Sequence, residues 1–421
     1  MKMIIKNPSQ IVTCSSFDGK KGSKMQDLNV LNDSSLVIED GIIKDIDKTN
    51  IILDKYNLDE YEIVDATNKA LLPGFVDSHT HFVFGGYREE EFSWRLRGDS
   101  YMDIMQRGGG IVSSVKSTKE EDFNTLYNSA KKRLDSMLSF GVTTVEGKSG
   151  YGLDMDTEIK QLEVMKKLNE DHVLDIATTF LGPHALPKEY NKDEMKFIDF
   201  MIEKVLPKVK EENLAEFADI FCEKNVFEIE SSRKYLNAAK EMGFKLKLHA
   251  DEIVRIEGAK LAGEVKATSA DHLLQASDEG IKSLVDNDVV CTLLPMTAFS
   301  LKEDYARARY MIDNGACVAL ATDLNPGSCF TNSIPLMISL ATIYMNMSIE
   351  ETINALTINA AKAVSREKEV GSIDVGKKAD MIILEFPSYK FLSYHIGVNI
   401  VEKVIKSGKL VFDKTKGGIL C

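Results

Sequence analysis

The apolar positions of this chain follow two patterns that occupy different parts of the sequence. Short apolar runs broken by tight turns mark both ends: SLVIEDGIIKDI turns at Asp40 and Gly41, and KVIKSGKLVF turns at Ser407 and Gly408. A dipeptide ending in glycine suits the positive φ of a two-residue hairpin. Because both ends are rich in strands, the sequence predicts that residues 1–70 and 366–421 pair into one small composite β-sandwich domain.

The middle of the chain, residues 71–365, alternates short β-branched runs with longer helical stretches such as DTEIKQLEVMKKLNE. Eight runs are strand candidates: LLPGFVDSHTHF, GVTTVEGKSGYG, DIATTFLGPHA, FADIFCEKNVF, FKLKLHADE, KATSADHLLQ, VVCTLLPMTAF and ACVALATDLNPGS. Repeated strand–helix alternation is typical of the α/β class, and we expect a distorted (β/α)8 TIM-like barrel. An open doubly wound sheet is the alternative.

Composition narrows the class of protein. The 421 residues are 44% apolar and 28% charged, with a net charge of −13 and no dominant basic segment. This balance is typical of a folded, water-soluble domain and predicts no nucleic-acid or membrane partner. Six scattered cysteines without a C-x-x-C pair, and an N-terminus without a signal-peptide pattern, favour a cytoplasmic protein.

Histidine placement is the strongest chemical signal. Of only seven histidines, five lie in or just after strand candidates, where barrel enzymes build their active sites. They are His79, His81, His184, His249 and His272. Strand alternation places His79 and His81 on one face, and Asp323 ends the eighth strand. A divalent cation would offset the cost of burying these groups together, although a hydrogen-bonded histidine pair also explains the H-x-H pattern alone.

Several other polar residues are candidates for the active site, and each also has an ordinary structural interpretation. Arg88 follows FGGY and can form a forked contact with a carboxylate, or lie on the surface of the charged run REEEFSWRLR. Tyr151 in SGYG and His184 in GPHA offer polar groups to a ligand or pack as ordinary strand-end residues. Glu252, three residues after His249, can transfer a proton or simply begin a helix. Asp77 supports the first-strand histidines or forms a turn.

One tempting motif fails on spacing. Gly147, Lys148 and Ser149 look like the end of a phosphate-binding loop, but that loop requires glycine where Val142 stands. We therefore expect no nucleotide-phosphate site here.

The histidine and aspartate pattern resembles that of the amidohydrolase superfamily. Its members carry H-x-H after strand 1, histidines after strands 5 and 6, and aspartate after strand 8, and all four elements are present. No evident lysine occupies the fourth-strand position that bridges two metals in binuclear members, which favours the mononuclear branch. The run LTINAAKAVSREKEVGSIDVGKKADMIIL also resembles the return from barrel to small β domain.

The resemblance extends over nearly the whole chain in one branch of that superfamily. The resemblance is found in these segments: PGFVDSHTHFVFGGYREEEF, the GGGI run at Gly108–Ile111, EGKSGYGL, TTFLGPHALP, LHADE, SADHL and ATDLNPGS. This branch implies hydrolysis of the cyclic amide of 4-imidazolone-5-propanoate to N-formimidoyl-L-glutamate in histidine degradation. The alternatives are a mononuclear deaminase acting on a nucleobase-like heterocycle and a barrel kept only as a scaffold.

The resemblance also implies a role for each site residue. One divalent metal per chain, Zn²⁺ or Fe²⁺, would be held by His79, His81, His249 and Asp323. Proton transfers would fall to His272, Glu252 and Asp323. The substrate contacts would be Arg88, Tyr151, His184, Glu252, Asn325, Gly327 and Ser328. A homodimer is the oligomeric state that the resemblance implies.

Overall fold

Eight parallel strands follow one another in chain order around a barrel in the computed structural model, which describes residues 2–99, 107 and 109–420. They are β8 (Phe75–Asp77), β9 (Val142–Lys148), β10 (Asp175–Phe180), β11 (Phe217–Ala218), β13 (Lys245–Ala250), β14 (Ser269–His272), β15 (Val290–Leu293) and β16 (Val318–Leu320). A short strand, β12 (Phe221–Cys222), also pairs with β13. A bridge between Thr80 and Leu324 joins the first and last strands of the ring. The predicted barrel is confirmed, and each strand candidate contributes a strand to it.

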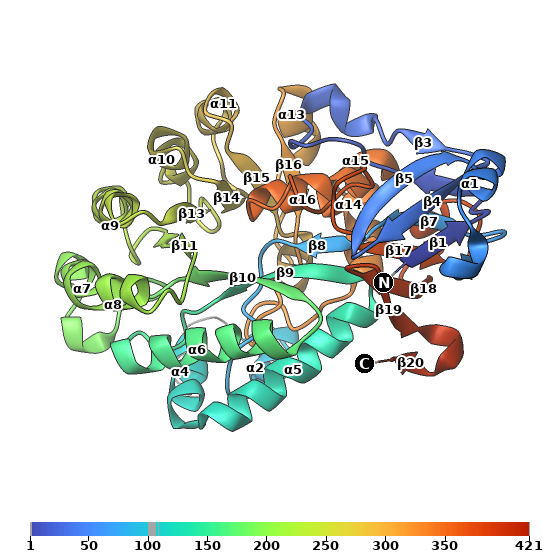
Figure 1. Cartoon of the computed structure of the whole chain (residues 1–421). Helices are drawn as coiled ribbons and strands as arrows, with labels where there is room; N and C mark the ends of the chain where they lie inside the picture. The colour runs from blue at the N-terminus through green and yellow to red at the C-terminus, as the bar shows by residue number, and fades with distance from the viewer. Residues whose placement is uncertain (1, 100–106, 108, 421) are drawn as a thin grey trace.

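Helices lie around the barrel strands (Figure 1), and their apolar side chains are buried against the barrel. The long helix α5 (Phe123–Ser139) shows how the sequence achieves this. It begins after Asp122, whose carboxylate accepts a hydrogen bond from the backbone N–H of Thr125. Leu126, Ala130 and Leu134 recur every four residues and are buried, so one stripe of the helix faces the core.

The other helices of this region have the following bounds: α2 (Glu89–Leu96), α4 (Ile111–Glu120), α6 (Met155–Asp171), α7 (Glu194–Phe200), α8 (Leu206–Glu211), α9 (Ile229–Glu241), α10 (Gly258–Val265), α11 (Asp278–Asp286), α12 (Pro295–Leu301), α13 (Ala308–Asp313), α14 (Ile334–Ile343), α15 (Ile349–Leu356) and α16 (Ile358–Ala363). Short helical turns are η3 (Lys188–Tyr190) and η4 (Met201–Val205). Gly108, the first residue of the GGGI run, lies outside the described residues.

Strands from both ends of the chain lie side by side next to the barrel, at the right of Figure 1. One sheet has the order β5-β4-β1-β6, and the other the order β20-β19-β18-β17-β7-β2-β3. The strands are β1 (Lys2–Lys6), β2 (Gln10–Val12), β3 (Val30–Leu31), β4 (Ser34–Glu39), β5 (Ile42–Lys48), β6 (Glu62–Asp65), β7 (Ala70–Pro73), β17 (Met381–Leu384), β18 (Val401–Lys406), β19 (Lys409–Asp413) and β20 (Gly418–Ile419). Helices α1 (Thr49–Lys55) and α17 (Phe391–Tyr394) and the turns η1 (Gly22–Gln26), η2 (Leu58–Glu60) and η5 (Lys414–Lys416) complete this region.

The second of these sheets is sandwiched between two cores. Leu71 of β7 and Ile383 of β17 are paired and belong to the cluster shared with the first sheet. Their neighbours Leu72 and Ile382 are also paired and belong to the barrel cluster. Successive side chains of this sheet therefore enter opposite cores. Both of its faces are apolar, and the sheet attaches the sandwich to the barrel.

Both predicted hairpin turns are present. Asp40 and Gly41, between β4 and β5, have φ values of 50° and 82°. Ser407 and Gly408, between β18 and β19, have φ values of 46° and 74°. Two successive positive φ angles are the signature of the turn that matches the twist of paired strands.

The chain crosses from sandwich to barrel at Gly74, between β7 and β8. A Cβ atom at this position would lie 2.3 Å from Oγ1 of Thr143, so only glycine fits. The run LLPGFVDSHTHF is thus divided between two sheets. The domain boundaries expected at residues 70 and 366 stay a prediction. Among the described residues, no helix combines the length and the apolar character needed to cross a membrane.

Candidate active site

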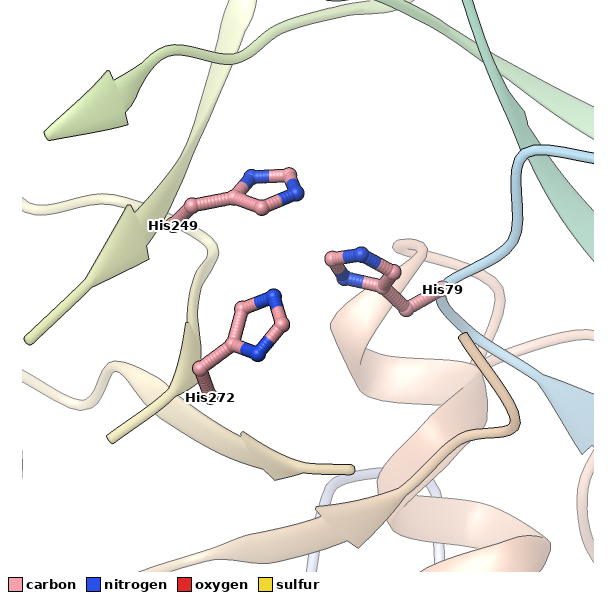
Figure 2. A group of neighbouring side chains, drawn as sticks. All are labelled: His79, His249 and His272. Carbon is pink, nitrogen blue, oxygen red and sulfur yellow. The ribbon is translucent and has the colours of Figure 1, made fainter. Parts of the chain in front are cut away.

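The carboxyl ends of the barrel strands bring the predicted site residues together. His79 and His81 follow β8, His249 lies in β13, His272 ends β14 and Asp323 follows β16. Figure 2 shows the rings of His79, His249 and His272 entering one common space from separate segments. Active sites of (β/α)8 barrels form at this end, because the strands point their following loops to the same face.

Barrel closure fixes the backbone of the H-x-H segment. The N–H of Asp323 donates to the carbonyl of His79 at 3.0 Å, and the N–H of His81 donates to the carbonyl of Leu324 at 2.8 Å. Asp323 itself has a φ of 52°, a left-handed conformation that non-glycine residues seldom adopt. The first and last strands are therefore joined at the residues expected to bind metal.

Asp77 is placed to support His79 and His81, which is one of the two roles that the sequence suggested for it. Its carboxylate accepts hydrogen bonds from the N–H of Thr322 at 3.0 Å and from the hydroxyl of Thr322 at 2.6 Å. Burial raises the pKa of Asp77 to about 7. The side chain thus ties β8 to the segment that follows β16, two residues before the histidines.

The donor atoms of the predicted ligands lie close together. Nε2 of His79 is 3.5 Å from Oδ1 of Asp323, and Nε2 of His81 is 3.7 Å from the same oxygen. The ring centroids of His79 and His249 are 4.6 Å apart. Ligand atoms of His79, His81 and Asp323 all lie within 4.8 Å of one another, as do those of His79, His249 and His272. The two groups share His79, so one cation can contact members of both.

The protonation of two histidines suits a metal. Nδ1 of His79 is 2.7 Å from Oδ2 of Asp271, and Nδ1 of His249 is 3.1 Å from Oδ2 of Asp219. A proton shared with a carboxylate at Nδ1 leaves the lone pair on Nε2. Both Nε2 atoms are buried and have no hydrogen-bond partner among the described residues. Three imidazole nitrogens and one carboxylate oxygen therefore fit a divalent cation.

Burial keeps most of the site uncharged. It lowers the pKa of His79, His81 and His272 well below the usual value, so these rings are neutral at pH 7. His249 is the exception: burial disfavours its charged form too, but the charge of Asp219 and the hydrogen bond to it raise the pKa of His249. Burial raises the pKa of Asp323 to about 6. Burial and the nearby charge of Asp323 raise the pKa of Glu252 to about 8, so its carboxyl group is mostly protonated at pH 7.

The other aromatic and acidic candidates line the same space. The ring of His184 stacks on that of His81 at a centroid distance of 5.0 Å, and Tyr151 lies 5.4 Å from His184. Oε1 of Glu252 is 3.5 Å from Nδ1 of His272. The side chains of Tyr151 and Glu252 thus approach the histidines from different loops.

The loop after β16 is organised by one side chain. Oδ1 of Asn325 accepts hydrogen bonds from the N–H groups of Gly327 and Ser328, each at 2.8 Å, while its amide donates to the carbonyl of Asp323 at 2.7 Å. A Cβ atom on Gly327 would lie only 2.0 Å from Nη1 of Arg88. Glycine here therefore leaves space for the arginine, and the structure brings Arg88 and this loop together.

Comparison with known proteins assigns the family. Residues 70–411 match the amidohydrolase family. The chain is 65% identical over 413 residues to the imidazolonepropionase of Clostridium tetani, which covers 98% of this chain and 99% of that protein. It is 57% identical over 409 residues to the imidazolonepropionase of Parabacteroides distasonis, covering 97% and 98% of the two chains. The chain belongs to the imidazolonepropionases of the amidohydrolase family.

The barrel of this amidohydrolase is also similar to that of distant solved structures. An adenosine deaminase from Xanthomonas campestris, solved with bound zinc, superposes with a TM-score of 0.70. The identity is 16%, and the match covers 97% of this chain and 92% of that one. At this identity the likeness supports the fold alone.

A buried ion cluster that the sequence pattern did not predict lies beneath the histidines of this amidohydrolase. Nζ of Lys148 is 2.7 Å from Oδ2 of Asp219, 3.0 Å from Oε1 of Glu146 and 3.5 Å from Oδ2 of Asp271. Nζ of Lys247 is 2.8 Å from Oε2 of Glu146. All five side chains are fully buried. Lys148 thus bridges Asp271 and Asp219, the two carboxylates that contact His79 and His249.

A sequence signal for this cluster does exist. Glu146 and Lys148 stand two residues apart in VTTVEGK, and Lys247 stands two residues before His249 in KLKLHA. Strand alternation places each such pair on one face. Charged residues at these positions of a buried strand predict an internal ion network.

Proposed function

We propose that this chain hydrolyses the ring amide of 4-imidazolone-5-propanoate, producing N-formimidoyl-L-glutamate in histidine degradation. One observation supports the chemistry: the buried Nε2 atoms of His79 and His249 have no hydrogen-bond partner among the described residues, and His79 lies close to both His249 and the Asp323 carboxylate. Membership of the imidazolonepropionases supports the substrate.

The donor set supports one divalent metal per chain, Zn²⁺ or Fe²⁺, held by His79, His81, His249 and Asp323. Such an ion, when bound, lowers the pKa of a coordinated water toward ~7 and polarises the amide oxygen. The second carboxylate oxygen of Asp323 accepts a hydrogen bond from the hydroxyl of Thr297 at 2.6 Å. That bond leaves Oδ1 turned toward the histidines.

Proton transfer is the task of the remaining polar groups. In the reaction, the oxygen of water bonds to the carbonyl carbon, the ring C–N bond breaks and the departing nitrogen gains a proton. His272, which burial keeps neutral, accepts the proton of the attacking water together with Asp323. Glu252, whose pKa is raised to about 8, supplies the proton to the ring nitrogen. The contact between Glu252 and His272 supports exchange of the proton between them.

The rest of the site binds the substrate. Arg88 holds the propionate tail with two charge-assisted hydrogen bonds. Tyr151 and His184 contact the ring and the tail, since the buried Tyr151 and the partly buried His184 both lie beside His81. Asn325, Gly327 and Ser328 form the opposite wall.

The test is direct turnover. Purified protein is given 4-imidazolone-5-propanoate, and the loss of imidazolone absorbance is followed with native metal content, after exhaustive chelation and after metal is restored. We expect turnover to disappear on chelation and to return with about one equivalent of metal. Full turnover in protein shown by elemental analysis to be metal-free would refute the mechanism. Deamination of guanine or cytosine that does not require Arg88 would favour the deaminase alternative.

We further propose that the protein is a cytoplasmic homodimer. Five described cysteines are free and buried, which suits a reducing compartment. Light scattering of the purified protein tests the dimer, and a mass of one chain would refute it.

A further inference from the structure

Arg88, the residue just before α2, binds a carboxylate of that helix. Nε of Arg88 donates to Oε2 of Glu91 at 3.0 Å, and Nη2 donates to Oε1 of Glu91. The pair is sheltered, since the side chains of Arg88 and Glu91 are 14% and 12% exposed. Two parallel hydrogen bonds fix a guanidinium in both position and plane.

The geometry leaves a second edge of the guanidinium available. Glu91 occupies the edge formed by Nε and Nη2, and Nη1 donates no hydrogen bond among the described residues. Nη1 lies in the space that Gly327 keeps open, beside the loop expected to line the site. A guanidinium has five N–H donors, so the edge formed by Nη1 and Nη2 can still bind another carboxylate.

Glu91 is also held by a backbone N–H group from outside its helix. Its Oε2 accepts a hydrogen bond from the N–H of Gly110 at 2.7 Å. Burial would raise the pKa of Glu91, but the hydrogen bonds from Arg88 and Gly110 and the charge of Arg88 hold it below its usual value. Glu91 is therefore a fixed anion. Gly110 belongs to the GGGI run and has a φ of 82°, which glycine adopts without strain.

We propose that Glu91 is a positioning residue that holds Arg88 ready for the carboxylate tail of the substrate. The inference rests on the proposed function, because it takes the propionate as the ligand of Arg88. Glu91 and the propionate would bind different edges of the guanidinium, with the positive charge between the two anions. Each anion is then nearer to the guanidinium than to the other anion, so attraction to the guanidinium outweighs the repulsion between the two anions. Without Glu91, the long Arg88 side chain regains its rotamer freedom and binds the tail less well.

Steady-state kinetics of metal-loaded variants test this role. Glu91→Ala should raise KM for imidazolonepropionate about tenfold, the scale of one hydrogen bond to a charged group. Its kcat should change less than about twofold, because the reacting atoms are untouched. Glu91→Asp, which keeps the charge, should recover part of the loss. The matched control is Glu90→Ala, an exposed residue on the same helix, and it should change neither constant.

A double-mutant cycle separates this inference from the proposed function. If Glu91 acts through Arg88, adding Glu91→Ala to Arg88→Ala should have no further effect. A 4-imidazolone lacking the propionate serves as second probe, and its kcat/KM should be equal in wild type and Glu91→Ala. An unchanged KM in Arg88→Ala would refute the carboxylate site itself. If Arg88→Ala shows the expected defect, three results for Glu91→Ala would each overturn the positioning role. These are no change in KM, an effect that adds to that of Arg88→Ala, and an equal effect on the probe without the propionate. A lower KM in Glu91→Gln would also overturn it, because repulsion would then dominate.

Discussion

Replacing Lys148 by methionine tests whether the buried ion cluster organises the site. The substitution keeps an unbranched side chain, shorter only by the terminal amine, and removes the charge from the contacts with Glu146, Asp219 and Asp271. These contacts more than offset burial and raise the pKa of Lys148, so the lysine is charged in the folded protein. Removing it leaves carboxylates buried without their main cation.

The expected loss of stability follows from this geometry. Breaking a buried pair by removing one partner costs about 3–5 kcal/mol. We expect the lower end, about 3 kcal/mol, because Lys247 still pairs with Glu146 at 2.8 Å. At ~2.1 cal/mol/K per residue, a 421-residue chain that unfolds as one unit has an unfolding entropy of about 0.9 kcal/mol/K. The melting temperature of the metal-free protein should therefore fall by about 3 °C.

The same substitution should weaken metal binding. Asp219 and Asp271 orient the Nδ1 atoms of His249 and His79, and loss of such partners typically costs 10–100-fold in affinity, so about tenfold or more is expected here. Calorimetry of the metal-free protein and competition with a chromophoric chelator give the two quantities. Lys167→Met is the control, because Lys167 is 48% exposed and its surface pair with Asp171 contributes little. If Lys148→Met matched this control in both measurements, the cluster would not be what orients the histidines.

Three further substitutions address the metal and the substrate tail. His79→Ala should abolish both bound metal and turnover, whereas the exposed His395→Ala should retain about one metal per chain by elemental analysis. Gly327→Ala should raise KM for imidazolonepropionate more than about tenfold, because its Cβ displaces Nη1 of Arg88; normal KM would show that the arginine is not used there. Arg88→Lys should recover only part of the kcat/KM lost in Arg88→Ala, since an ammonium makes no fork, and full recovery would contradict bidentate binding.

The sequence was most informative where chemistry coincides with a strand end. His79, His81, His249 and Asp323 each follow or end an apolar run, and parallel strands bring such positions to one face of a barrel. Their proximity could therefore be predicted from separate segments. Asp219 and Asp271 occupy similar positions, but an aspartate at a strand end equally suggests a turn. Only the pairing of strands reveals that their carboxylates face inward.

Local pattern was less informative where the structure selects among equivalent residues. Glu89, Glu90 and Glu91 follow one another in REEEF, and only the helical turn places the third beside Arg88. The division of LLPGFVDSHTHF between two sheets at Gly74 could not be predicted, for a related reason. A continuous apolar run gives no information on which sheet its residues join, and the close approach of Thr143 that requires glycine there comes from distant sequence.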